Sequence, residues 1–106
     1  MADIRIGVII NGATGRMGAT LLRTLPEFPG LALHAAVTMS GHPDAGRDVG
    51  QWLGGASRGL SLGTDLSAAL AGASVAIDFS SGAATAANVS ACARAAVPLM
   101  LGTTGF

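Results

Sequence analysis

The sequence contains no lysine, no tyrosine and a single cysteine, Cys92. One cysteine excludes an internal disulfide and a cysteine-rich metal site, so no metal is expected. Because Cys92 lies between Ala91 and Ala93, we interpret it as a small buried residue rather than a nucleophile. The absence of lysine and tyrosine removes two side chains that commonly transfer protons in enzymes.

Long apolar runs and clustered charge are also missing. The 6 basic and 6 acidic side chains are scattered, so there is no basic patch of the kind that binds nucleic acid or an anionic membrane. No run approaches the roughly 20 apolar residues that span a bilayer. The first five residues lack the basic start and apolar stretch of a secretory signal. We therefore expect a cytoplasmic protein that binds neither nucleic acid nor membranes.

What the chain does contain is apolar sequence in short runs. Its 106 residues are 50% hydrophobic and 11% charged, which fits one folded domain without an internal boundary. Apolar runs that are too short for helices predict strands at residues 4–10, 31–37, 60–62, 75–79 and 98–101.

Helices are predicted between most of these strands. Apolar spacing predicts one helix from Met17 to Pro26, and Asp65 is placed to cap a brief helix that runs through Leu70. An alanine-rich helix is predicted at 83–95, capped by Ser80 or Ser81. Residues 38–59 are predicted to be a surface loop with one helical turn. Strands that alternate with helices predict an α/β fold, a Rossmann-type doubly wound parallel sheet in three α/β/α layers.

The most informative motif is the glycine-rich turn at residues 12–18, which follows the first strand and opens the first helix. A diphosphate needs backbone N–H groups at a helix N-terminus, and glycines allow its close approach. The strand and helix on either side are the context that this motif requires. We therefore predict that the turn binds the pyrophosphate of a nicotinamide dinucleotide, with Arg16 contacting the cofactor or simply solvated.

The end of the second strand bears on the form of the cofactor. An acidic residue there favours NAD through hydrogen bonds to the ribose, but this chain has Thr38 and no carboxylate until Asp44. We therefore expect NADPH to bind at least as well as NADH. His42 and Arg47 either help to bind the added phosphate or are ordinary loop residues.

Two further strand ends are candidate ligand contacts, because ligands bind at the carboxyl ends of such strands. After the fourth strand, Phe79 either borders the nicotinamide or packs in the core, and Asp78 is placed to hold the loop by hydrogen bonds. After the fifth strand, Gly102, Thr103 and Thr104 offer backbone donors and two hydroxyls, which favours ligand contact over a plain turn.

Three segments together closely resemble the bacterial dihydrodipicolinate reductase family. The resemblance runs from Ile4 to Phe106 and is carried by these segments: Gly12-Ala13-Thr14-Gly15-Arg16-Met17-Gly18, Ile77-Asp78-Phe79-Ser80 and Leu101-Gly102-Thr103-Thr104-Gly105-Phe106. It implies a reductase of diaminopimelate and lysine biosynthesis, which transfers hydride from NADPH or NADH to a cyclic dicarboxylate substrate.

The resemblance also implies roles for particular residues. The pyrophosphate side of the cofactor would be bound by Gly12, Ala13, Thr14, Gly15, Arg16 and Met17. Gly102, Thr103 and Thr104 would contact the nicotinamide end, and Thr104 a substrate carboxylate. The family usually has an acid where this chain has Thr38 and often an arginine at Met39, and its usual Arg-Pro-Glu-type segment is replaced here at residues 81–83.

The family's second domain supplies a histidine-rich motif, a lysine and most of its homotetramer contacts. Neither His34 nor His42 matches that motif. We therefore expect residues 1–106 to be the NAD(P)-binding domain of a two-domain reductase, with no catalytic residue and no turnover of its own. The alternatives are a short-chain-type reductase, a non-catalytic dinucleotide-sensing module and a structural domain without a ligand.

Overall fold

The computed structural model describes residues 5–80 and 82–102. Its centre is a five-stranded parallel sheet with the strand order β3-β2-β1-β4-β5. The strands are β1 (Ile6–Asn11), β2 (Leu31–Val37), β3 (Leu62–Gly63), β4 (Val75–Asp78) and β5 (Leu99–Leu101). All five predicted strands are present, although β3 lies slightly later in the chain than expected.

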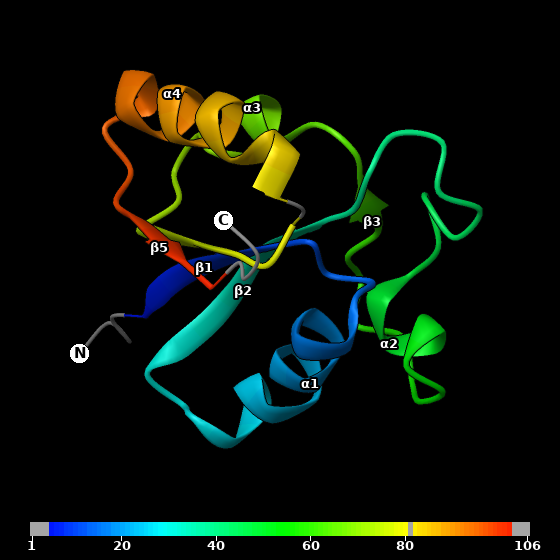
Figure 1. Ribbon diagram of the computed structural model, residues 1–106. Helices are drawn as coiled ribbons and strands as arrows, with labels where there is room; N and C mark the ends of the chain where they lie inside the picture. The colour runs from blue at the N-terminus through cyan, green and yellow to red at the C-terminus, as the bar shows by residue number, and fades with distance from the viewer. Residues whose placement is uncertain (1–4, 81, 103–106) are drawn as a thin grey trace.

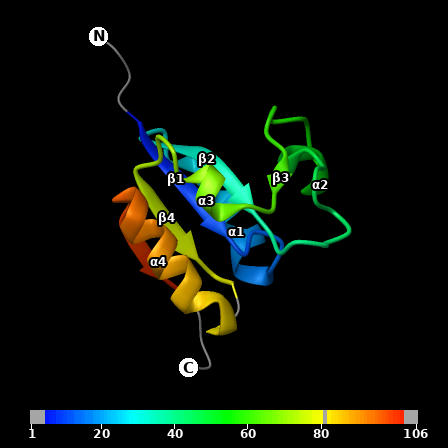
Figure 2. The same ribbon diagram turned by 90° about the horizontal axis from the view of Figure 1, so that it is seen from above.

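Helices cover both faces of this sheet. They are α1 (Arg16–Thr24), α2 (Val49–Trp52), α3 (Leu66–Ala69) and α4 (Thr85–Ala95), with short 3-10 turns at Leu25–Glu27 and Gly82–Ala84. Figures 1 and 2 show α3 and α4 on one face and α1 on the other, with α2 beside β3. The predicted three-layer Rossmann-type fold is confirmed. Within 5–80 and 82–102, no helix has the length and apolar character to cross a membrane.

The core consists of two apolar clusters, one on each face of the sheet. In β1 the side chain of Ile9 packs with α3 and α4, whereas Val8 and Ile10 pack toward α1. All three are almost completely buried, as expected for a central parallel strand with both faces covered. Cys92 lies in the α4 cluster, and burial raises the pKa of its thiol, which confirms the interpretation as a core residue.

The long segment after β2 contains the single helical turn expected for it, α2. Asp48 caps this turn by accepting a hydrogen bond from the Gln51 N–H at 3.0 Å. The same carboxylate accepts bonds from the Ser57 hydroxyl at 2.9 Å and from the Arg58 and Gly59 N–H groups at 3.1 and 3.0 Å. One side chain therefore holds both ends of a glycine-rich loop.

The predicted cap of α4 is wrong. The helix begins at Thr85 after the 3-10 turn, and its N-cap is Ala84, which has no side-chain cap hydrogen bond. Ser80 lies too early to cap it, because its N–H donates to Asp78 Oδ1 at 2.8 Å and its hydroxyl accepts from Asn88 Nδ2 at 3.0 Å. The other predicted cap, Ser81, lies outside the described residues. Asp65 does cap α3, since it accepts from the Ala68 N–H at 3.2 Å.

Candidate functional site

A cavity of about 390 Å³ opens at the carboxyl ends of β1, β2 and β4. This is the crevice in which ligands of open α/β sheets bind. Five of the predicted site residues line it: Gly12, Thr14, Gly15, Thr38 and Phe79. Its remaining lining residues are Asn11, Val37, Met39, Ser40, Thr64, Leu66, Ser80, Ala84 and Asn88.

Two glycines of the first turn are required by the fold. Gly12 has φ +77°, and a Cβ there would lie 2.6 Å from the backbone carbon of Phe79. At Gly18 a Cβ would lie 2.7 Å from Ala13 Cα, where α1 packs against the turn. Side chains are therefore excluded at both positions by backbone atoms, whatever the protein binds.

The third glycine, Gly15, has no such structural need. It is the exposed N-cap of α1 with φ −75°, and a Cβ there would make an ordinary contact with the Gly12 oxygen at 3.4 Å. Because Gly15 lines the cavity, the missing side chain leaves space at the start of the helix. A ligand that approaches the backbone closely needs this space.

The start of α1 offers several unpaired N–H groups. The Gly12 and Ala13 amides donate to the Val37 oxygen at 2.9 and 3.0 Å, so they brace the turn against β2. By contrast, among the described residues the amides of Thr14, Arg16 and Met17 have no acceptor, and α1 has no side-chain cap. Unpaired amides at the positive end of a helix dipole form an anion site.

The other predicted site residues lie around the cavity without lining it. Ala13 is fully buried, and the side chains of Arg16 and Met17 are exposed. Gly102 packs under the Phe79 ring, where a Cβ would lie 2.9 Å from Cζ, and its N–H donates to the Asp78 oxygen at 2.8 Å. Thr103 and Thr104 lie outside the described residues.

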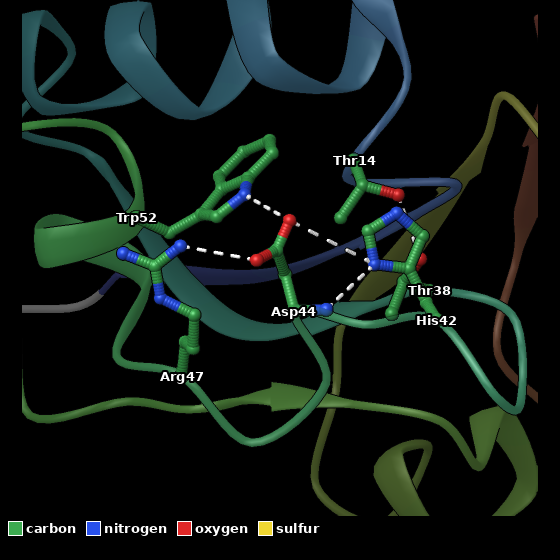
Figure 3. A network of polar contacts seen from close by, with 6 residues as sticks. All are labelled: Thr14, Thr38, His42, Asp44, Arg47 and Trp52. Atoms are coloured by element: carbon green, nitrogen blue, oxygen red, sulfur yellow. Dashed lines mark hydrogen bonds and ion pairs between the residues drawn. The ribbon is translucent and has the colours of Figure 1, made fainter.

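Thr38 joins the end of β2 to the first turn. The residue is 4% exposed, and its Oγ1 lies 2.7 Å from Thr14 Oγ1. Figure 3 shows these two side chains. A hydroxyl pair therefore occupies the place where an acidic residue would face a ribose. The neighbouring Met39 is 72% exposed and lines the cavity without charge.

The first carboxylate after β2, Asp44, belongs to a separate polar network. It accepts from the Arg47 guanidinium at 3.0 Å and from the Trp52 ring N–H at 3.1 Å (Figure 3). The hydrogen bond from Arg47, and after it the one from Trp52, holds the pKa of the Asp44 carboxyl below its ordinary value. His42 accepts from the Asp44 N–H at 3.0 Å. Neither His42 nor Arg47 lines the cavity, and their described side-chain contacts are with Asp44 of the same loop.

Sequence reasoning missed two polar partners of Asp78 at the carboxyl ends of β1 and β4, Asn11 and Asn88. Asp78 is fully buried and accepts hydrogen bonds from Asn11 Nδ2 at 3.2 Å, from the Ser80 N–H at 2.8 Å and from Asn88 Nδ2 at 2.9 Å. The expectation that Asp78 holds the loop is confirmed. Asn11 was detectable as the polar end of an apolar run, but Asn88 reaches the group from one turn inside α4.

The fold and the site together define a Rossmann-type α/β domain, in which the glycine-rich turn after β1 has the form of a phosphate-binding turn. Residues 6–106 match the family model described as dihydrodipicolinate reductase, N-terminus. The chain belongs to this family, and the family resemblance seen in the sequence is confirmed.

Curated relatives give the same result. Proteins named 4-hydroxy-tetrahydrodipicolinate reductase are 46% identical in Anaeromyxobacter dehalogenans strain 2CP-1 and 43% identical in Halorhodospira halophila. A third, from Syntrophus aciditrophicus, is 38% identical. The matches cover 93%, 95% and 92% of this chain but only 37%, 38% and 37% of the relatives. The chain thus spans little more than a third of their length.

Proposed function

We propose that residues 1–106 are the domain of a 4-hydroxy-tetrahydrodipicolinate reductase that binds its nicotinamide dinucleotide. The observation that carries this proposal is the start of α1, where the Thr14, Arg16 and Met17 amides have no acceptor among the described residues. Two negatively charged phosphates match these donors in charge and in geometry. Gly15 is exposed beside them and leaves room for a phosphate.

We propose the remaining contacts from the residues that line the cavity. The adenosine half lies toward Thr38, Met39 and Thr64, and the nicotinamide half toward Phe79 on the β4 side. Gly102 supports the Phe79 ring, and we propose Thr103 and Thr104 as further contacts of the nicotinamide end. The cofactor supplies the hydride when bound, and the residues of this chain bind and orient it.

We further propose that NADPH binds at least as well as NADH. Thr38 carries no charge and bonds to Thr14, and the Asp44 carboxylate is engaged by Arg47 and Trp52. No carboxylate therefore repels a 2′-phosphate from the described cavity lining. Fluorescence titration of both cofactors measures the preference. A preference for NADH of more than about tenfold, roughly 1.4 kcal/mol, would contradict the proposal.

The activity of the whole protein comes from its relatives' names and is proposed on that basis. We propose that the parent enzyme reduces a cyclic dicarboxylate substrate in diaminopimelate and lysine biosynthesis, in the cytoplasm and as a homotetramer. The curated relatives are nearly three times as long as the segment they share with this chain. The remaining length would supply the substrate-binding and proton-donating residues, so no catalytic residue is proposed in this chain.

Replacing Gly15 with valine tests the proposed phosphate site. Its Cβ meets no closer atom than the Gly12 oxygen at 3.4 Å, so the variant should fold while its side chain blocks the cavity. In the unaltered chain, NADPH at about 100 times its Kd should stabilise the fold by about 2.7 kcal/mol, measured by thermal unfolding. Gly15→Val should lose this stabilisation.

Gly30→Val is the matched control. Gly30 precedes β2 at the opposite end of the sheet, has ordinary φ, and a Cβ there would meet no atom within 4 Å. This variant should keep the full response to NADPH. If Gly15→Val responds as strongly as Gly30→Val, the phosphate site is misassigned.

A further inference from the structure

Asp78 is a buried carboxylate whose described partners are all uncharged. Its Oδ1 accepts from Asn11 Nδ2 and from the Ser80 N–H, and its Oδ2 accepts from Asn88 Nδ2. In all three bonds the Asp78 oxygen is the acceptor. Each of the three partners must therefore present a hydrogen to it, which fixes which way the Asn88 amide is turned.

The orientation of Asn88 has a consequence for the cavity. Both Nδ2 hydrogens of Asn88 are engaged, one by Asp78 Oδ2 at 2.9 Å and the other by Ser80 Oγ at 3.0 Å. Its Oδ1 has no donor within the part of the chain that the structure describes. Asn88 lines the cavity, and the two bonds that hold its Nδ2 leave its oxygen available to accept from a ligand donor.

The position of Asn88 indicates which part of a dinucleotide it meets. It comes from α4, and its partners Asp78 and Ser80 are at the carboxyl end of β4, across β1 from the Thr38 end of β2. With the pyrophosphate at the start of α1, this side of the cavity faces the nicotinamide nucleoside. That half carries two kinds of donor, the carboxamide NH2 and the ribose hydroxyls.

We propose that Asn88 is a cofactor-binding residue whose Oδ1 accepts a hydrogen bond from the nicotinamide nucleoside, and that Asp78 is the positioning residue that orients it. This inference rests on the proposed dinucleotide site. It adds a specific polar contact to the nicotinamide side of the cavity and gives the buried side chain of Asp78 a role in binding.

The test compares two ligands on one set of variants. NADH carries the nicotinamide nucleoside, and ADP has the same adenosine and diphosphate without it. Asn88→Leu keeps a similar size but has no acceptor. It should weaken NADH binding about fivefold, the effect of one neutral hydrogen bond, and leave ADP binding within about twofold. Ser90→Leu, at an exposed position of α4, should change neither.

Asp78→Asn tests the positioning role without changing the size of the side chain. An amide in place of the carboxylate can donate to Asn88, so the Asn88 amide is free to turn and its oxygen is no longer fixed toward the ligand. NADH binding should weaken by about twofold to fivefold while ADP binding is retained. Retained ADP binding shows that each variant is folded; Asn88→Ala replaces Asn88→Leu if the latter is not.

An analogue identifies the donor. In reduced 3-acetylpyridine adenine dinucleotide an acetyl group replaces the carboxamide and removes its NH2. If the carboxamide is the donor, the unaltered chain should bind this analogue about fivefold more weakly than NADH, and Asn88→Leu should bind both alike. If a ribose hydroxyl is the donor, Asn88→Leu should weaken both ligands equally. Either result supports the contact.

Two results would overturn the inference. Unchanged NADH affinity in Asn88→Leu would show that its oxygen makes no such contact. An equal loss for NADH and ADP would show a general disturbance of the cavity. If the unaltered chain binds neither ligand, the proposed dinucleotide function itself fails, and this inference fails with it.

Discussion

At the scale of single residues, the three glycines of the first turn do different work. Gly12 and Gly18 have no side chain because backbone atoms of Phe79 and Ala13 occupy the space. Gly15 has room for one, so no neighbouring backbone atom excludes a side chain there. The motif therefore combines two positions where backbone atoms exclude a side chain with one where they do not.

Alanine substitutions should separate these roles in stability measurements. Gly18→Ala forces a Cβ against the backbone of the turn and should lower the free energy of unfolding by about 2 kcal/mol or more. Gly15→Ala meets no such contact, and alanine at an N-cap is only somewhat worse than glycine, so the loss should stay within about 1 kcal/mol. Urea denaturation measures both. Equal losses would contradict the assignment of roles.

At the scale of elements, one side chain organises the α2 loop. Asp48 accepts several hydrogen bonds, and they hold the pKa of its carboxyl far below the ordinary value. The bond from the Gln51 N–H has the largest effect. A carboxyl with a depressed folded pKa stabilises the fold above its unfolded pKa of about 3.9. That contribution is lost as the pH falls from there toward the folded pKa.

Denaturation at a series of pH values tests this. Asp48→Ala should unfold at a lower urea concentration than the unaltered chain at about pH 7, and the difference should shrink below about pH 4. Glu27→Ala removes an exposed carboxylate that has no hydrogen-bond partner among the described side chains, and should match the unaltered chain throughout. A difference for Asp48→Ala that stays constant down to the lowest pH would contradict the role of its charge.

Local patterns predicted most of these elements. β1 is a run of β-branched residues bounded by a glycine turn, and α1 has regular apolar spacing and a proline stop, so both are determined by neighbouring residues. The α4 cap was predicted wrongly because Ser80 is held by Asp78 and Asn88, partners that only the folded chain brings together. β3 has two residues and depends on pairing with β2.

The candidate site, like the fold, could be predicted only in part from the sequence. The turn at Gly12, Thr14 and Gly15 could be found because one continuous segment supplies strand, turn and helix start. Asn88 could not, since its place in the cavity depends on how α4 packs over β4. Likewise, the bonds of His42 and Arg47 to Asp44 could not be predicted, because they depend on how the loop folds.

At the scale of the whole molecule, the order of the parallel strands brings together site residues that are far apart in the sequence. β1 lies between β2 and β4, so the turn after β1 meets Thr38 on one side and Phe79 on the other. Of the helices that begin at this edge, α1 and α4 lack a side-chain cap, whereas Asp65 caps α3. The domain thus presents backbone donors and short polar side chains to one crevice, as a domain that binds and orients a cofactor requires.

The central claim is that the amides at the start of α1 bind the cofactor's phosphates. A titration of the 15N-labelled chain with NADPH, followed by amide NMR, tests it most directly. We expect the largest changes at the Thr14, Arg16 and Met17 amides, with Gly30 and Gly72 at the opposite edge of the sheet unchanged. If saturating NADPH leaves the resonances of these three amides unchanged, or shifts those at the opposite edge of the sheet most, the claim is contradicted.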